Sequence, residues 1–361
     1  MQVDPVTLER YKKEAPELLG AVEQDSDNTY IMRKDKQTGY CVKFEDGICK
    51  IHKERGEGFL SDACNLYPRI TRTAGDAQIM TATMSCPEIA RIALYGNEPF
   101  VFDETLFARV PFEVRNILPD GMTQNDIIET HKLFMQATGD ETANAEKIFA
   151  RIASVSRSLQ RVEKKDWVRA AGLYFRLAES SIPAPEENIN DPFNLLHSLC
   201  GLVVASKKNI PPRLQQTISD MEEALHVRLD WENILIHTSD ESADAYNKLH
   251  SLWKNKMQEN FQPLLKRWLG AQLSSSLYPF AGLGESLTER VTIIGVRFAI
   301  LRLALISAYS ISNNQLHQYD VVRIVQSLSR FLDHLADPKF SLEIYGEAGW
   351  TKENRMLGLL N

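Results

Sequence analysis

The stretch that decides the fold is VTIIGVRFAILRLALISAYSI, residues 291–311, the most apolar run of the chain. A helix that crosses a bilayer needs about 20 apolar residues with few or no charges. Arg297 and Arg302 interrupt this run. We therefore expect a buried helix of a soluble protein here, and no contact with a membrane.

Helical patterns flank this stretch from about residue 100 onward, because apolar residues recur there at helical spacing. One helix should begin at Thr123. We predict further helices over residues 144–159, 165–179, 192–207, 213–227, 240–270, 285–311 and 318–336. No strand pattern alternates with them, so a doubly wound sheet is not expected. The sequence predicts a mainly α protein.

The chain has 361 residues, more than one hydrophobic core usually serves. We expect a cysteine-rich, metal-binding region over residues 1–100, small and rich in loops. It should pack on a larger α-helical domain over residues 101–361. Residues 36–39 and 45–47 carry turn signals in the first region.

The charge balance and the N-terminus bear on compartment and partners. A formal net charge of −7 argues against nonspecific binding to nucleic acid, which depends on a surplus of Lys and Arg. Residues 1–17 alternate charged and apolar side chains and do not form a signal peptide. We expect a cytoplasmic protein.

A helix start is visible after residue 84. Ser85 has the form of an N-cap, with Glu88 at the third position and Pro87 tolerated in the first turn. The helix should run to about Leu94, with Gly96 as its C-cap.

Four of the five cysteines lie within 46 residues, in the spacing C-x7-C-x14-C-x21-C. They are Cys41, Cys49, Cys64 and Cys86. Thiolates suit zinc or an iron–sulfur cluster, and four of them complete either site. Cys86 stands at the first turn of the predicted helix, where the helix dipole favours the thiolate. We predict that these four cysteines bind one metal centre.

Other uses of these cysteines stay open. Free cysteines are often small buried apolar residues, and these spacings match no short zinc-finger template. A disulfide or redox role is a further alternative. His52 could replace one thiolate in a zinc site, because Cys49-x2-His52 has workable spacing. Cys200, between leucines, is expected in the core.

Several segments carry a family resemblance. They are Gly47-Ile48-Cys49-x2-His52, Gly56-Glu57-x2-Leu60-Ser61-x2-Cys64-x2-Tyr67-Pro68-Arg69, Ser85-Cys86-Pro87-Glu88-Ile89-Ala90-Arg91 and Val322-x-Ile324-Val325-Gln326-Ser327-x-Ser329-Arg330-x3-His334. The first three resemble the cysteine-rich segment of the bacterial flagellin lysine-N-methylases, and the last resembles that family's final conserved helix. The resemblance implies methyl transfer from S-adenosylmethionine to lysine ε-amines of flagellin, and a cysteine-bound metal centre, iron–sulfur or alternatively zinc.

The sequence departs from that family at its start. Family members usually carry an earlier cysteine group, with an adjacent Cys-Cys pair and a Trp, before a segment like Val3-Asp4-x2-Thr7-x3-Tyr11. This sequence begins inside that pattern, at Met1-Gln2. We expect either a start further upstream or a member that lost the group.

Lysine methylation needs a neutral amine, so the enzyme must remove a proton from a group of pKa about 10.4 or lower that pKa by desolvation. Tyr67, Glu88 and Tyr95 lie near the cysteines, but surface or packing roles suit them better, and we assign no catalytic residue. The cofactor-binding residues are also unassigned, since Gly282-Leu283-Gly284 is a lone G-x-G of the kind that forms a loop and a helix cap.

Three functions compete. The first is a protein-lysine methylase acting on flagellin. The second is a metal-binding helical interaction protein related to the methylases but without activity. The third, a redox enzyme with an iron–sulfur centre, is the weakest because flavin and nicotinamide motifs are missing from the sequence.

Overall fold

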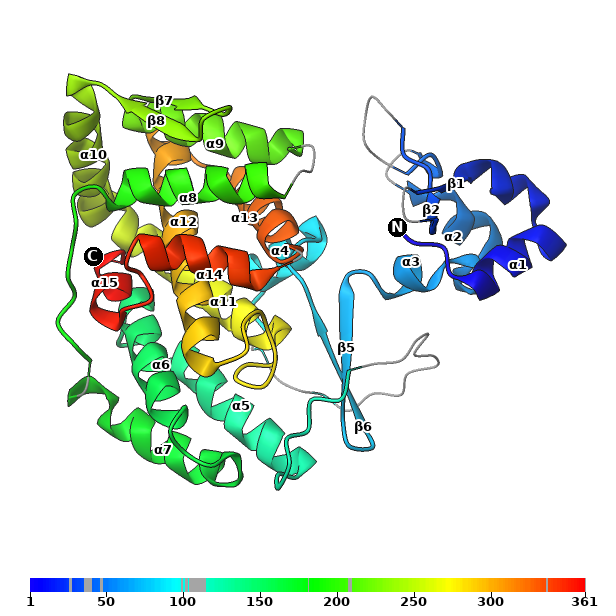
Figure 1. The fold of residues 1–361 in the computed structure, drawn as a ribbon, viewed down its shortest axis with the longest axis horizontal. Helices are drawn as coiled ribbons and strands as arrows, with labels where there is room; N and C mark the ends of the chain where they lie inside the picture. The colour runs from blue at the N-terminus through cyan, green and yellow to red at the C-terminus, as the bar shows by residue number, and fades with distance from the viewer. Residues whose placement is uncertain are drawn as a thin grey trace. The chain divides into compact units, whose positions relative to one another are not determined.

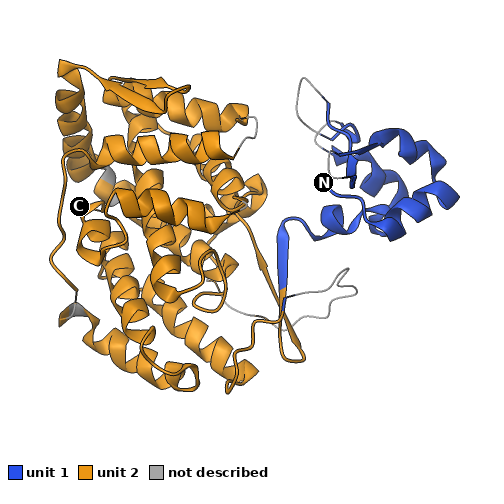
Figure 2. Ribbon diagram, in the orientation of Figure 1, with its two compact units in different colours: residues 1–71, 104–115 blue, residues 72–103, 116–361 orange. Residues whose placement is uncertain are grey.

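The computed structural model (Figure 1) describes residues 1–25, 28–35, 41–45, 48–98, 100, 103, 115–180, 182–206, 210–335 and 337–360. Its elements are mainly helices, so the predicted fold class is confirmed. The predicted turns at residues 36–39 and 46–47 lie outside the described residues. Two compact units divide the chain (Figure 2): unit 1 contains Met1–Thr71, and unit 2 contains Arg72–Asp103 and Asn116–Asn361.

Unit 1 combines short helices with two-stranded antiparallel sheets. Strand β1 pairs with β2, and β3 pairs with β4. Its elements are α1 (Pro5–Glu14), η1 (Pro16–Ala21), β1 (Val22–Gln24), β2 (Tyr30–Met32), β3 (Phe44–Glu45), β4 (Ile48–Cys49), α2 (Lys50–Arg55), η2 (Glu57–Phe59) and α3 (Asp62–Leu66).

Tyr11 is the largest side chain in the small core of unit 1, and it is 1% exposed. Its hydroxyl donates to the main-chain oxygen of Phe59 over 2.8 Å, which ties α1 to η2. Asp4 caps α1 by accepting from the N–H of Thr7 (2.8 Å), and it also accepts from the N–H of Asp62 (3.0 Å). One carboxylate therefore joins the first and last helices of this unit.

Unit 2 is a helical body with two hairpins. Its elements, with the strand β5 that leads into it, are β5 (Arg69–Ala74), β6 (Ala77–Ala82), α4 (Pro87–Tyr95), α5 (Gln124–Thr138), α6 (Ala145–Leu159), η3 (Lys164–Asp166), α7 (Trp167–Leu177), η4 (Ala178–Ser180), α8 (Asp191–Ala205), α9 (Pro212–Leu225), β7 (Val227–Asp230), β8 (Leu235–Thr238), α10 (Asp240–Leu252), η5 (Trp253–Met257), α11 (Gln258–Ser275), α12 (Leu287–Ile311), α13 (Gln318–Leu332), α14 (Pro338–Glu347) and α15 (Glu353–Gly358).

Helix α12 forms the centre of unit 2, where Figure 1 shows other helices on both sides of it. It is long and apolar enough to cross a membrane, but every residue from 291 to 308 is buried inside the protein. Its two arginines are paired: Arg297 with Asp333 at 2.7 Å, and Arg302 with Glu146 at 3.3 Å. The burial of this helix confirms the prediction, and acidic partners from elsewhere in unit 2 compensate both charges.

Two of the predicted helices begin at capping residues that are recognisable in the sequence. Thr123 and Asp126 form a capping box at the start of α5, and Asn144 caps α6 through the N–H of Lys147. The predicted cap of α4 is wrong, however. Cys86 holds the N-cap position, and the side chain of Ser85 makes no capping bond. Ser85 is buried instead, and its main-chain oxygen bonds to another helix.

Sequence reasoning missed the two hairpins of unit 2. Strands β5 and β6 flank Gly75-Asp76, and β7 and β8 flank residues 231–234. Gly75 has φ +64°, a backbone conformation that glycine adopts without steric cost. The alternation of apolar and polar residues around Gly75 was the available signal for the first hairpin.

Candidate functional site

Three of the four predicted ligands lie in unit 1 and pack against its core. The backbone of Cys41 pairs with that of Lys34 in an isolated antiparallel β-bridge. Cys49 ends β4 and precedes α2, and Cys64 lies in α3. Each side chain is half-buried. The N–H of Lys43 donates to the Sγ of Cys41 over 3.5 Å.

The three thiols lie around Tyr11. Burial raises the pKa of Tyr11, and the charges of Cys64, Cys49 and Cys41 raise it further. Burial also raises the pKa of Cys64, with smaller contributions in the same direction from Cys41 and Cys49. All three cysteines also pack against the cluster of buried side chains that contains Tyr11, so they lie in one part of unit 1.

The remaining cysteines have other surroundings. Cys86 belongs to unit 2 as the N-cap of α4. Cys200 is in the core of unit 2, as predicted, and burial raises its pKa to about 12. His52, the reserve ligand, is exposed on α2. Within the described part of the chain, no group of three or more His, Cys, Asp or Glu side chains has the arrangement of a metal site. The ligand assignment stays a prediction.

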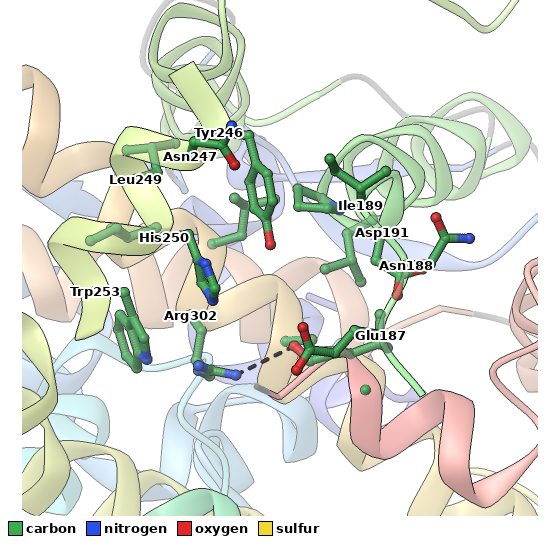
Figure 3. A pocket seen from close by; sticks show the side chains of 17 residues that line it. Glu187, Asn188, Ile189, Asp191, Tyr246, Asn247, Leu249, His250, Trp253 and Arg302 are labelled. Carbon is green, nitrogen blue, oxygen red and sulfur yellow. Dashed lines mark hydrogen bonds between the residues drawn. The ribbon is translucent and has the colours of Figure 1, made fainter. Parts of the chain in front are cut away.

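A pocket of about 320 Å³ in unit 2 was not predicted. We call it the Tyr246 pocket. Its walls are formed by helices α8, α10 and α12 and by the π-helix η5, and Leu359 lines one side. Figure 3 shows the rings of Tyr246, His250 and Trp253 on one side and Glu187 opposite them. Its volume is in the range of small-molecule sites.

The aromatic side chains of the pocket come from a single stripe. Tyr246, His250 and Trp253 stand at i, i+4 and i+7, so one helical face presents all three. The rings of Tyr246 and His250 stack, with centroids 5.7 Å apart and planes 13° apart. Trp253 stacks on Arg302, whose guanidinium carbon lies 4.5 Å from the ring centroid.

Ion pairs hold the floor of the pocket. Asp191 accepts two bonds from Arg355, of 2.7 and 3.2 Å, and one from the indole N–H of Trp350 at 3.3 Å. Arg355 also donates to the main-chain oxygen of Glu186 (2.6 Å), which fixes the segment leading to Glu187. The side chains of Asp191 and Arg355 are 7% and 9% exposed, so each charge is compensated mainly by the other.

The pocket falls within a known domain. A model of the C-terminal domain of the FliB lysine N-methylase matches residues 175–359, just over half of the chain. The chain belongs to this lysine N-methylase family. The matched range includes every residue that lines the Tyr246 pocket. Neither a curated protein nor a solved structure gives a significant match.

Membership of the methylase family confirms the resemblance, and the structure joins two of the segments that carried it. The main-chain oxygen of Ser85 accepts from Gln326 at 2.9 Å, and its hydroxyl lies 3.5 Å from Nε2 of His334. Thr83 donates to Asp333 at 3.3 Å. The start of α4 is therefore fixed to α13 through polar side chains of the family's C-terminal domain.

The other residues considered from sequence have surface or structural positions. Glu88 pairs with Arg91 at 2.7 Å on the surface. Tyr67 is 41% exposed and Tyr95 is 36% exposed, and partial burial of the Tyr95 ring raises its pKa to about 12. Gly284 has φ +98°, and its main-chain oxygen accepts from Arg290 within the loop that precedes α12. Gly282-Leu283-Gly284 therefore belongs to a loop that leads into the start of a helix, as expected.

Proposed function

We propose that this chain transfers a methyl group from S-adenosylmethionine to lysine ε-amines of flagellin in the cytoplasm. The observation that carries the proposal is the match of residues 175–359 to the lysine N-methylase domain. A ligand-sized pocket lies inside that domain. Its aromatic rings and the carboxylate at its mouth suit the binding of a cationic ligand. The net charge of −7 supports a protein partner over nucleic acid.

The reaction sets simple demands on this chain. The lysine ammonium first gives one proton to water. The lone pair of the neutral nitrogen then forms the C–N bond to the methyl carbon of the donor, and the S–C bond breaks with its electrons going to sulfur. The protein must align the two groups and desolvate the amine. Leu249 and Leu303 give the pocket buried apolar walls.

We further propose that the cysteines of unit 1, Cys41, Cys49 and Cys64, bind an iron–sulfur cluster, with zinc as the alternative metal; Cys86 as the fourth ligand stays a prediction from the sequence. The packing of these three cysteines against one small core, which contains Tyr11, supports this assignment. Their donor chemistry fits either metal. A bound metal would also brace unit 1, whose core has few large apolar side chains.

The test uses the full chain, purified without oxygen and loaded with iron. It is incubated with unmodified flagellin and S-adenosylmethionine, and the lysines are then examined by mass spectrometry. We expect mass increases of whole methyl groups on flagellin lysines. Metal-loaded, folded protein that leaves flagellin unmodified would overturn the proposal and favour the non-enzymatic metal-binding alternative.

A further inference from the structure

We propose that the Tyr246 pocket binds the methyl donor, a nucleoside joined through a sulfonium to an amino acid. The proposal rests on the function proposed above, and it assigns this pocket to the donor. The competing occupant is the acceptor lysine. The size, the aromatic wall and the charges of the pocket each bear on that choice.

The size of the pocket favours the donor. A single unbranched lysine side chain needs a narrow channel and would leave most of about 320 Å³ unfilled. Empty space of this kind gives up contacts that a well-fitting ligand would make. A nucleoside with an amino-acid tail is the larger of the two ligands of a lysine methylase, and its size is that of ligands found in pockets of this volume.

The aromatic wall favours a flat base. Tyr246 and His250 stack almost in parallel, and both are half-buried, so part of each ring faces the pocket. Figure 3 shows the two rings pointing into the same space from α10. Every nucleobase has a π-face, and stacking on aromatic side chains is how proteins bind bases without reading their edges.

The charges favour a ligand that has a cation as well as an acceptor. Glu187 and the amides of Asn188 and Asn247 line the exposed mouth. Burial raises the pKa of Tyr246, and the charges of Glu187 and Asp191 raise it further, while that of Arg302 lowers it. A sulfonium is a permanent cation, and carboxylates and aromatic faces attract it.

Arg302 provides a donor at the inner end. Its guanidinium is 9% exposed, pairs with Glu146 and donates to the main-chain oxygen of Leu359 at 3.3 Å. A guanidinium carries five N–H donors, more than these two partners use. The donor molecule has a carboxylate that can accept such a bond. An acceptor lysine has no carboxylate on its side chain, and the lone pair of its neutral amine must stay free to attack the methyl carbon, so it would leave this donor unused.

The test measures binding without flagellin, by isothermal titration calorimetry of the metal-loaded chain with S-adenosylmethionine and with its product, S-adenosylhomocysteine. Tyr246→Ala should weaken the affinity for both by about 5- to 150-fold, which corresponds to the roughly 1–3 kcal/mol of one base–aromatic stack. Tyr246→Phe keeps the ring and should bind as the unchanged protein does. Tyr319→Ala, a matched change at a tyrosine that is 64% exposed on α13, should have no effect.

Two further variants sharpen the result. Glu187→Gln should weaken binding of the cationic donor more than that of the neutral product, by up to about five-fold, the range of an exposed ion pair. Asn247→Trp places a large ring at an exposed position of the mouth and should block both ligands without disturbing the core. This variant keeps the test valid if Tyr246→Ala fails to fold.

The outcomes separate the two proposals. If the unchanged protein binds neither ligand and leaves flagellin unmodified, the proposed function fails. If it binds the donor and the Tyr246→Ala and Asn247→Trp variants bind it equally well, the function stands and the pocket assignment is overturned. A rise in the flagellin KM in these variants, with unchanged donor affinity, would assign the pocket to the acceptor instead.

Discussion

The buried pair of Asp191 and Arg355 gives the sharpest prediction about what holds the pocket in shape. Asp191 lies in the first turn of α8 and accepts three hydrogen bonds, two from Arg355 and one from Trp350. Asp191→Ala removes all three at once. It leaves a guanidinium that is 9% exposed, with its bond to Glu186 as the remaining contact among the described residues.

The expected loss is large because the charge that stays behind is buried. Breaking a buried ion pair by removing one partner costs about 3–5 kcal/mol, most of it from the uncompensated charge. Removing both charges avoids that cost, so Asp191→Ala with Arg355→Met should be more stable than Asp191→Ala alone, by about 2 kcal/mol or more. Both variants lose the favourable position of Asp191 at a helix start, so that contribution cancels in the comparison.

Urea unfolding followed by tryptophan fluorescence measures the difference. All five tryptophans, at positions 167, 231, 253, 268 and 350, belong to unit 2, so the signal reports this unit alone. The two single variants and the double variant complete a thermodynamic cycle. A coupling free energy below about 0.5 kcal/mol, the additivity seen for independent sites, would refute the reasoning.

Three other predictions concern separate parts of the chain. Burial lowers the pKa of His131 to about 4, so between pH 6.5 and 4 the unfolded chain binds a proton that the folded chain does not. The free energy of unfolding should therefore fall by about 3 kcal/mol as the pH drops through this window, and His131→Gln should flatten the slope in urea titrations. Gly358→Ala would drive a Cβ into a main-chain oxygen of the segment before α8 and should cost about 1–3 kcal/mol in the same assay, whereas Gly172→Ala, with open space around its Cβ, should be neutral or stabilising. Cys49→Ser should lower the metal content of anaerobically purified protein sharply, while Cys200→Ala should leave it unchanged, as elemental analysis would show.

Local signals predicted much of the helical fold. The capping residues Thr123 and Asn144 stand next to the segments they cap, so a short stretch of sequence contains the whole interaction. The run around Val291 was also readable, since two charges in an apolar helix point to partners inside a protein core. These inferences needed no information from distant residues.

Tertiary contacts decided the rest. Ser85 has the sequence of a cap, but a glutamine 241 residues away takes its main-chain oxygen and the helix begins one residue later. The spacing of Tyr246, His250 and Trp253 was visible in the sequence. A stripe of aromatics usually predicts core packing, however, and the segments that oppose it, from residue 187 and residue 302, are far away in the chain.

The charges of the Tyr246 pocket divide into two groups that should respond differently to mutation. Those on its floor are paired within the protein: Asp191 with Arg355, and Arg302 with Glu146. Glu187, at the mouth, is exposed, and an exposed charge contributes little to stability. A change on the floor should therefore lower the free energy of unfolding first and binding only through it. Glu187→Gln should leave the urea midpoint unchanged while it weakens donor binding. If Glu187→Gln lowered the midpoint as Asp191→Ala does, the mouth would be part of the structural framework, and the distinction between the two groups would be wrong.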